Sequence, residues 1–482
     1  MVKEFQPLLS PPPISTDEWH HVFLITIPLV LLQILEYLPL PILNMYLGHL
    51  GSSTPSTLMA GQHTCIASHT RSVDLDQSEN RVVLAAGGLS SLFFTTTAYS
   101  VVIGVSTAMD ALTAQAYGKG RGLELGIVLQ TAALCAGVLC VPLALVTFFS
   151  GSILVALGQP ADIANATQQL LRWYMLEIPL VFAYEYFKRV LQGQNIVWPI
   201  VAAISAGAGV ALSVGYVFVL HTSLGFVGAP LGMIGYYSTA GFLLYHLMHT
   251  PSMHFDWAAA KQNLPTFLCL SANGWLMFLS EFGGIAATSF MAGSLPDAST
   301  ALSANTIYAG FRSLFGMVYL GIGFASSVRV GNALGGNLPI RAKTAAWQTV
   351  QLGSWWAAAS TVSMVLVGPL YATLYTQDPA VLSEATTLFY ATAPFQVTMG
   401  VWGAVQGTLR GSGRPHQGAV ANVVGFVGVG VPLASVLSAY WGLVGLWVGI
   451  SVGFCLCAAY GLYWLVVADW EAIADDIALQ TA

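Results

Sequence analysis

Charged residues are scarce in this chain of 482 residues. Asp, Glu, Lys and Arg make up only 7% of it, whereas 56% of the residues are hydrophobic. Soluble domains usually contain about a quarter of charged residues. Apolar windows of about 20 residues, enough to cross a bilayer, recur along almost the whole sequence. This composition excludes an ordinary soluble domain and predicts an all-α polytopic membrane protein with about twelve transmembrane helices.

The cysteines and histidines also lack the spacing of a disulfide framework, a metal site or an enzyme site. The six cysteines are scattered, so no disulfide framework or zinc spacing is indicated. The ten histidines show no clustered spacing of the kind that an enzyme site would need, and we expect no enzymatic activity, metal or cofactor. The net charge of −6 is spread over the loops without a basic patch, which argues against a nucleic-acid partner. The first 18 residues do not resemble a signal peptide.

A polar break at residues 249–263 separates six expected spans from six. We therefore expect a cytoplasmic tail (1–21), an N-lobe (22–248), a cytoplasmic linker (249–263), a C-lobe (264–467) and a second cytoplasmic tail (468–482). The N-lobe contains a polar stretch near 57–84, which is either a loop insertion or an artefact of gene prediction. The spans are expected near 22–47, 83–105, 125–149, 170–191, 196–219, 224–248, 264–292, 300–327, 345–375, 385–408, 415–438 and 442–467.

Basic residues indicate the orientation, because cytoplasmic flanks retain Lys and Arg. An inside N-terminus places eleven of the fifteen basic residues on the cytoplasmic side. We therefore expect both termini in the cytoplasm, in either the plasma membrane or the vacuolar membrane. The eleven are Lys3, Lys119, Arg121, Lys188, Arg189, Lys261, Arg329, Arg341, Lys343, Arg410 and Arg414.

The two halves repeat each other. The segment GVSTAMDALTAQAYGKG aligns with GIGFASSVRVGNALGGN at a constant offset of 217, which pairs Gln115 with Asn332 and Gly118 with Gly335. RVLQGQ aligns with GTLRGS at an offset of 218. Because each repeat has six spans, both have the same membrane orientation, and the pseudo-twofold axis should follow the membrane normal. This pattern predicts two pseudo-symmetric six-helix lobes around a central cleft, as in transporters.

Five motifs occur in the order of a known family. They are YLGHLG in the first span, MDALTAQAYGKG after the second, LQGQNIVWP after the fourth, SVRVGNALGGN after the eighth, and GTLRGSGRPHQGAVAN between the tenth and eleventh. With them, the chain resembles the multidrug and toxic compound extrusion (MATE) transporters over essentially its full length, and most of all their eukaryotic, fungal branch. The resemblance implies export of organic cations, drugs or amphipathic metabolites by alternating access, in exchange for protons or sodium, and of these two ions we expect protons. Sodium coupling and a lipid flippase of the wider superfamily are the alternatives, and we expect a monomer in the lipid bilayer.

Two glutamates lie in spans that contain no other charge: Glu36 in ILEYLPLPILNMYLGHLG and Glu281 in SEFGGIAATSFMAGSL. A carboxylate inside a bilayer usually faces a cavity, pairs with a cation or takes up a proton. The resemblance implies that Glu281, twelve residues before Gly293, is the family's transport glutamate, and Glu36 lies twelve residues before Gly48. We expect both acids to couple protons to substrate, with a structural buried acid as the alternative for each.

The family pattern is incomplete here. Eukaryotic members often carry a second acid eleven residues before the Arg of the LRGSG motif, where this chain has Met399, which puts a C-lobe site with two carboxylates in doubt. Helical spacing places Gln33 and Asn44 on the face of the first acid, and Asn273 and Thr288 on the face of the second. These side chains either leave room for water or ligand, or only allow close helix packing.

Arg312 lies fifteen residues after the turn expected near Asp297, at the depth of Glu281 sixteen residues before it. The two side chains could form an ion pair that acts as a gate or substrate switch, or a plain structural pair. Trp275 and Trp402 could offer ring faces to an organic cation, or simply fill the membrane core.

The remaining polar residues are interpreted as structural or gating. Asp110 lies near the cytoplasmic end of the second span. Glu177 and Glu185 should pair locally on their own helix, where Arg172, Lys188 and Arg189 are within reach. Arg312 is the only basic residue expected inside the spans, which argues against the basic cavity of a lipid flippase. The motif residues assigned a structural role are Gln115, Gly118, Asn332, Gly335, Arg410 and Gly411.

Overall fold

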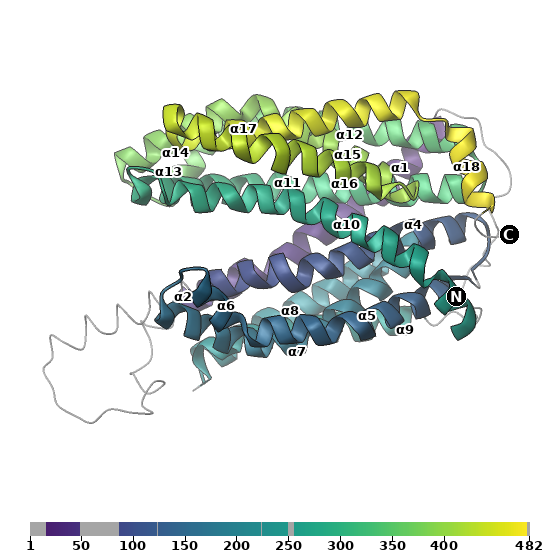
Figure 1. Ribbon diagram of the computed structural model, residues 1–482, viewed down its shortest axis with the longest axis horizontal. Coiled ribbons are helices and arrows are strands. Elements are labelled where there is room, and N and C mark those ends of the chain that lie inside the picture. Colours follow the sequence, from purple (N-terminus) through teal and green to yellow (C-terminus); the bar gives the residue numbers. More distant parts are fainter. Residues whose placement is uncertain (1–15, 49–85, 123, 223, 249–254, 480–482) are drawn as a thin grey trace, which may run out of the picture.

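The computed structural model describes residues 16–48, 86–122, 124–222, 224–248 and 255–479 (Figure 1). Within these ranges the regular structure is helical, and no strand occurs. The expected insertion at 57–84 and much of the linker lie outside them. The N-lobe helices are α1 (Thr16–Tyr37), α2 (Pro39–Gly48), η2 (Thr95–Tyr99), α4 (Ser100–Gly118), α5 (Glu124–Phe148), α6 (Ser150–Ala156), α7 (Ala161–Gly193), α8 (Trp198–Leu220), η3 (Gly225–Val227) and α9 (Gly228–Leu247).

The C-lobe helices continue the same pattern. They are α10 (Trp257–Ala292), α11 (Ala298–Gly335), α12 (Pro339–Leu366), α13 (Gly368–Thr373), α14 (Pro379–Thr392), η4 (Ala393–Phe395), α15 (Gln396–Gly411), α16 (Pro415–Asn422), η5 (Val423–Gly430), α17 (Val431–Val467) and α18 (Trp470–Leu479). By length and composition alone, seven helical segments of the described chain could cross a membrane. The others fall short for different reasons: α7 carries several charged side chains, whereas α9 carries none but is not apolar enough.

Breaks in the helices have local causes. Proline lacks the N–H that an α-helix needs, and α1 ends at Tyr37, two residues before Pro39. Within α17 the chain reverses at Gly442, whose φ of 54° and ψ of −132° suit only glycine. Consecutive helices that continue in one direction count as one span, and α17 counts as two helices that meet at Gly442. The described helices then form six spans in each lobe, as the apolar windows predicted.

Two hydrophobic clusters form the cores of the two lobes. One contains Leu29, Phe182 and Tyr236, and the other contains Phe389 and Trp447. Figure 1 shows the lobes as an upper and a lower layer of nearly parallel helices, with α1 and α10 running obliquely between them. Burial of these apolar side chains holds each lobe together.

Helices α1 and α10 each begin against the opposite lobe. Glu18 of α1 accepts hydrogen bonds from Arg329 and, at 2.6 Å, from Arg341 of the C-lobe. In the same way, the backbone N–H of Asp256, which caps α10, donates to the side chain of Gln130 in α5 at 2.7 Å. Each crossing helix therefore ties the two lobes together.

Close packing of these crossing helices follows the repeat. A Cβ atom added at Gly104 would lie 2.6 Å from the Cβ atom of Trp275, and one added at Gly321 would lie 2.7 Å from Val30. The two glycines are 217 residues apart, and their two neighbours are 245 residues apart. Those are the offsets at which the repeated motifs and the two glutamates align, so the sequence repeat is a structural repeat.

Left-handed backbone conformations repeat as well. Gly120 (φ 71°) corresponds to Asn337 (φ 55°) at an offset of 217, and Asn195 (φ 61°) corresponds to Gly413 (φ 71°) at 218. Glycine and asparagine adopt this conformation more readily than other residues. A left-handed turn therefore follows both α4 and α11, and another follows both α7 and α15.

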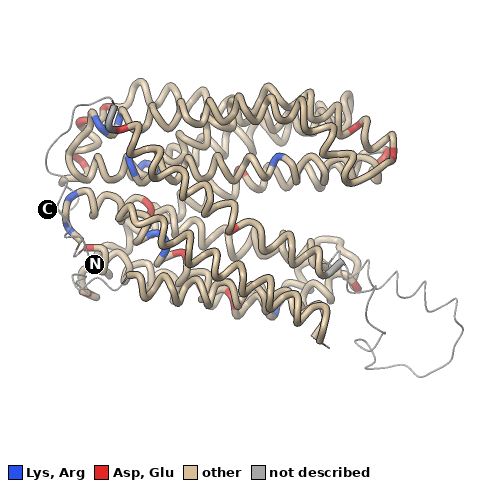
Figure 2. Tube along the Cα trace, turned by 180° about the vertical axis from the view of Figure 1, so that it is seen from behind, with Lys and Arg blue, Asp and Glu red and all other residues tan. Residues whose placement is uncertain are grey.

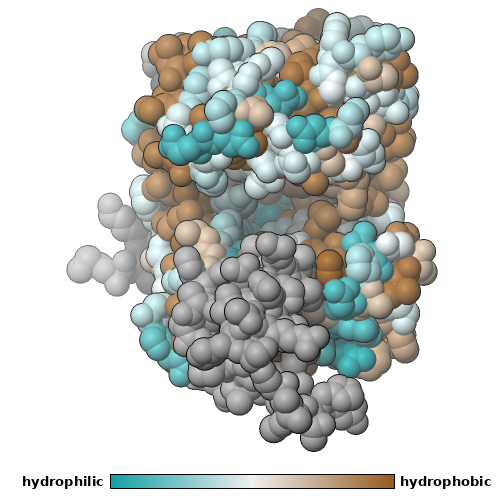
Figure 3. Space-filling model, turned by 90° about the vertical axis from the view of Figure 1, so that its left-hand side faces the viewer, coloured by the Kyte–Doolittle hydropathy of each residue, from teal (hydrophilic) through white to brown (hydrophobic). Residues whose placement is uncertain are grey.

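One end of the bundle, which we call the closed end, contains the ends of α4, α7, α11 and α15. The described chain also starts and finishes there, because Glu18 contacts Arg329 and Lys119 donates to the carbonyl oxygen of Ile477 at 2.8 Å. Figure 2 shows that basic residues gather at this end. Figure 3, which views the opposite end, shows a hollow between the two lobes. The lobes thus meet at the closed end and separate at the other.

Candidate functional site

Glu281 lies in the middle of α10 and is held by two neutral amides. Its Oε2 atom accepts hydrogen bonds from Gln406 of α15 and, at 3.4 Å, from Nδ2 of Asn422 at the end of α16. The amide of Asn422 also donates to the carbonyl oxygen of Met277 at 2.7 Å, which fixes its position. Arg312 and Arg410 are close enough to interact electrostatically with Glu281, but neither forms an ion pair with it within the described residues.

Glu36, near the end of α1, has a charged partner. Its Oε1 atom accepts from Nζ of Lys188 at 2.7 Å and from the hydroxyl of Tyr184 at 3.1 Å. Both partners lie on α7. Glu36 is therefore neutralised by an ammonium group, unlike Glu281.

The two glutamate sites are equivalent positions of the repeat. Glu36 and Glu281 are 245 residues apart, and Lys188 and Gln406 are 218 residues apart. In each lobe, then, the acid of the first helix contacts the side chain at the same position of the fourth helix. The geometry is duplicated, but a cation occupies the partner position in the N-lobe and a neutral amide occupies it in the C-lobe.

A buried network of charges continues from the N-lobe acid. Lys188 also contacts Glu185 at 2.5 Å, and Arg189 contacts Glu185 at 3.1 Å and Asp110 at 3.2 Å. The local pairing expected for Glu185 is thus confirmed, whereas Glu177 is buried and none of the ion pairs of the described residues involves it. Three acids and three bases balance when the last contact, from Arg410 of the C-lobe to Asp110 at 3.9 Å, is included.

This network corrects two expectations. Lys188, Arg189 and Arg410 were assigned to the cytoplasmic flanks, but all three are buried. The expectation that Arg312 would be the only basic residue inside the helices is therefore wrong. Carboxylates from other helices neutralise the three bases, which lets them lie in the interior.

The closed end is sealed by contacts between the repeated motifs of the two lobes. Nε2 of Gln115 donates to the carbonyl oxygen of Gly411 at 3.0 Å. A Cβ atom at Gly335 would lie 2.2 Å from the backbone oxygen of Gln115, and one at Gly118 would lie 2.1 Å from that of Asn332. Only glycine allows α4 and α11 to approach so closely, which explains why both motifs contain it.

The four polar residues that the sequence placed beside the two glutamates differ in burial and in hydrogen bonding. Gln33 is buried, and its Oε1 atom has no hydrogen-bond partner in the described part of the chain. Asn44 lies in α2, beyond the break after Tyr37, so it does not share a continuous helical face with Glu36. Asn273 and Thr288 donate to backbone carbonyls of α10, at 2.8 and 2.6 Å.

The two tryptophans differ in exposure. Trp275 is 38% exposed, and its indole N–H donates to Ser100 of α4 at 3.2 Å. Trp402 is fully buried in the C-lobe core, where Gly461 of α17 leaves room for its ring. In this conformation Trp402 has no exposed ring face for an organic cation.

Arg312 does not form the ion pair with Glu281 that its position in the sequence allowed. Its guanidinium carbon lies 5.2 Å from the ring centre of Trp447 and 5.6 Å from that of Phe454, both on α17. Counting residues from the turn placed the two side chains at a similar depth, but this count gives no information about how each helix is rotated. Glu281 instead faces α15 and α16.

The sequence did not point to the partners of the two glutamates. Gln406, Asn422 and Lys188 had no assigned contact with them, although the repeat offset of 218 already equates Lys188 with Gln406. Among the residues whose positions are described, no three His, Cys, Asp or Glu side chains come together as a metal site.

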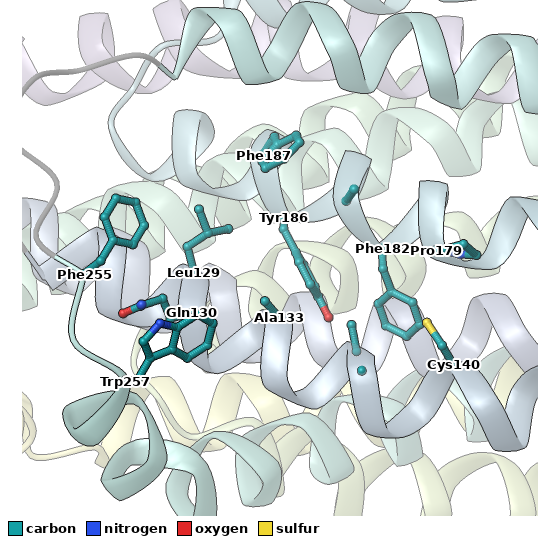
Figure 4. A pocket seen from close by; sticks show the side chains of 13 residues that line it. Leu129, Gln130, Ala133, Cys140, Pro179, Phe182, Tyr186, Phe187, Phe255 and Trp257 are labelled. Carbon is teal, nitrogen blue, oxygen red and sulfur yellow. The ribbon is translucent and has the colours of Figure 1, made fainter.

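A separate pocket of about 640 Å³ lies between α5 and α7. Its lining is mostly apolar, and neither glutamate contributes to it. Figure 4 shows Phe182 and Tyr186 extending from α7 towards α5, with Phe255 and Trp257 at one end. This pocket is distinct from the two acid sites.

Comparisons with known proteins identify the family. The model of the MatE family matches residues 80–217 and 275–436, one segment in each lobe. The chain belongs to this family. It is thus an integral, multi-pass membrane transporter and not an enzyme, and the family resemblance inferred from its motifs is confirmed.

Similar proteins come from animals and plants. The chain is 28% identical to multidrug and toxin extrusion protein 1 of Danio rerio (82% of this chain and 68% of the relative). It is 27% identical to protein DETOXIFICATION 17 of Arabidopsis thaliana (88% and 84%). A crystal structure of the eukaryotic MATE transporter AtDTX14 matches with a TM-score of 0.85, at 20% identity, over 97% of this chain and 99% of that one. This match confirms the expected fold of two six-helix lobes.

Proposed function

We propose that this MATE transporter exports organic cations, drugs or other amphipathic compounds in exchange for protons, by alternating access of its two lobes. Glu281 is the group that exchanges the proton. The single observation that carries the proposal is the hydrogen bonding of Glu281 to two neutral amides, Gln406 and Asn422.

Amides suit an acid that changes its protonation state. A carboxamide has both N–H donors and a carbonyl acceptor, so Gln406 can donate to ionised Glu281 and, after a rotation of the amide, accept from the protonated acid. Lysine has three donors and no acceptor. Lys188 therefore favours only the ionised form of Glu36, and protonation of Glu36 would leave an excess positive charge in a balanced, buried network.

The orientation is part of the same proposal. Basic residues gather at the closed end (Figure 2), and cytoplasmic flanks retain such residues. We therefore assign the closed end and both termini to the cytoplasm, in the plasma membrane or the vacuolar membrane, with the hollow of Figure 3 open to the opposite side. The transporter acts as a monomer.

Vesicles containing purified protein test the proposal. Transport of a fluorescent organic cation is measured under an imposed proton gradient and, separately, an imposed sodium gradient. Glu281→Gln should abolish the proton-driven flux, whereas the exposed Glu471→Gln in α18 serves as a matched control and should not. Normal proton-driven transport by Glu281→Gln would refute the assigned role, and flux that follows only the sodium gradient would refute proton coupling.

A further inference from the structure

Arg312 differs from the other buried bases of the described chain. Lys188, Arg189, Arg329 and Arg410 all contact a carboxylate. Arg312 is 9% exposed, and none of the hydrogen bonds or ion pairs of the described residues involves it. A guanidinium group carries five N–H donors, and in Arg312 none of the five has a hydrogen-bond acceptor among the described residues.

Such a charge is costly inside a membrane protein. A base within a transmembrane helix usually pairs with an acid or contacts a substrate pathway. The nearby rings of Trp447 and Phe454 compensate only in part, because a cation–π contact contributes about 0.5–2 kcal/mol. Something more than these two rings is needed to explain a charged side chain at this depth.

Glu281 does not supply the missing acceptor. Its carboxylate is held by Gln406 and Asn422, although it lies close enough to Arg312 for an electrostatic interaction. The C-lobe thus presents one acid with neutral partners and, near it, one base without a hydrogen-bond acceptor. Aromatic side chains, among them the buried Tyr308 and Trp447, surround the base.

We infer that Arg312 binds the anionic group of a transported compound, in the first place a carboxylate, so that the substrates include zwitterions. This inference rests on the proposed export function and specifies its substrate class. A carboxylate matches the planar fork of a guanidinium group and can accept two parallel hydrogen bonds. The cationic nitrogen of the same compound would lie towards Glu281. A cation without a carboxylate lacks this contact, and we expect it to bind more weakly than the matching zwitterion.

Two probes of the same size and shape test this charge preference. N-methylnicotinate carries a pyridinium nitrogen and a carboxylate, and N-methylnicotinamide carries the same ring with a neutral carboxamide. Equilibrium binding of each radiolabelled probe to the purified protein in detergent needs no ion gradient. The wild type should bind the zwitterion more tightly than the cation.

Substitution of Arg312 should reverse this preference. Arg312→Gln should weaken binding of N-methylnicotinate by about 10- to 100-fold, the effect of losing hydrogen bonds to a charged group, and leave N-methylnicotinamide binding equal or stronger. Arg312→Lys should recover part of the loss because it restores the charge. Arg172→Gln is the matched control, since Arg172 also lies over an aromatic ring, Phe148 at 4.7 Å, but is exposed.

Several outcomes would overturn the inference. For the wild type, these outcomes are no binding of either probe, or tighter binding of the cation. For Arg312→Gln, they are unchanged binding of both probes, or an equal loss of affinity for both. The melting temperature of each variant shows whether an equal loss of affinity for the two probes reflects unfolding. If Arg312→Gln is unfolded, Arg312→Lys must keep the preference for the zwitterion. Failure of proton-driven cation export in vesicles would refute the proposed function separately, because the binding assay does not depend on coupling.

Discussion

Gly335 offers a direct test of how the closed end is formed. A Cβ atom at this position would lie 2.2 Å from the backbone oxygen of Gln115 and 2.8 Å from its carbonyl carbon. These are backbone atoms of α4, so no side-chain rotation can relieve the clash. We predict that Gly335→Ala opens the closed end.

The size of the effect follows from the geometry. A carbon and a carbonyl oxygen are normally at least about 3.3 Å apart, so α4 and α11 must separate by about 1 Å. Overpacking of this kind costs about 1–3 kcal/mol. If rocking of the lobes relieves the strain, the ratio of closed to open protein falls by about 5- to 150-fold, because about 1.4 kcal/mol corresponds to a factor of ten.

Disulfide cross-linking measures this ratio. The side-chain amides of Asn195 and Asn332 are hydrogen-bonded across the closed end, so cysteines at both positions should cross-link in a protein whose native cysteines are replaced. Gly335→Ala should slow the cross-linking. Gly316→Ala is the matched control, because Gly316 lies on the same helix and has no atom within 4 Å of its added Cβ. Equal cross-linking rates in the two variants would refute the reasoning, as would a Gly335→Ala protein that simply unfolds.

Three further predictions concern the charges. Gln406→Lys should hold Glu281 in its ionised form, as Lys188 does for the N-lobe acid, and so remove the pH dependence of transport; an unchanged pH profile would contradict this. Lys188→Met should lower the melting temperature markedly, because removing one partner of a buried ion pair costs about 3–5 kcal/mol, and Glu36→Gln in the same protein should restore part of it. Asp110→Asn should slow the cross-linking described above, since arginines of both lobes contact this carboxylate.

Much of the fold could be predicted because it depends on patterns of residue type that are visible in the sequence itself. Apolar windows indicate the spans, and the offsets of 217 and 218 indicate the duplication. The contacts of Gly118 and Gly335 then explain the repeated motif in atomic terms, since each glycine faces the backbone of the corresponding helix in the other lobe. Hydrophobic burial and backbone sterics act on each segment, so the sequence carries this information directly.

The charge pairs could not be predicted in the same way, because they join residues far apart in the sequence. Lys188 and Arg410 lie near the ends of apolar windows, where basic residues usually face water. In the structure they are buried, because carboxylates on other helices neutralise their charge. The hypothesis of an ion pair between Glu281 and Arg312 was wrong for a related reason. Spacing along the chain fixes the depth of a side chain, whereas its partner depends on how the helix is rotated and packed.

Helix α15 links the proposed proton site to the contact between the lobes. Gln406 contacts Glu281, and Arg410, four residues later, contacts Asp110 of the N-lobe. Residues four apart lie on the same face of a helix, about one turn from each other. If protonation of Glu281 changes its hydrogen bond with Gln406, any rotation or shift of α15 moves Arg410 as well. The Asp110–Arg410 contact, the longest of the network at 3.9 Å, is therefore the place where we expect proton uptake in the C-lobe to loosen the closed end.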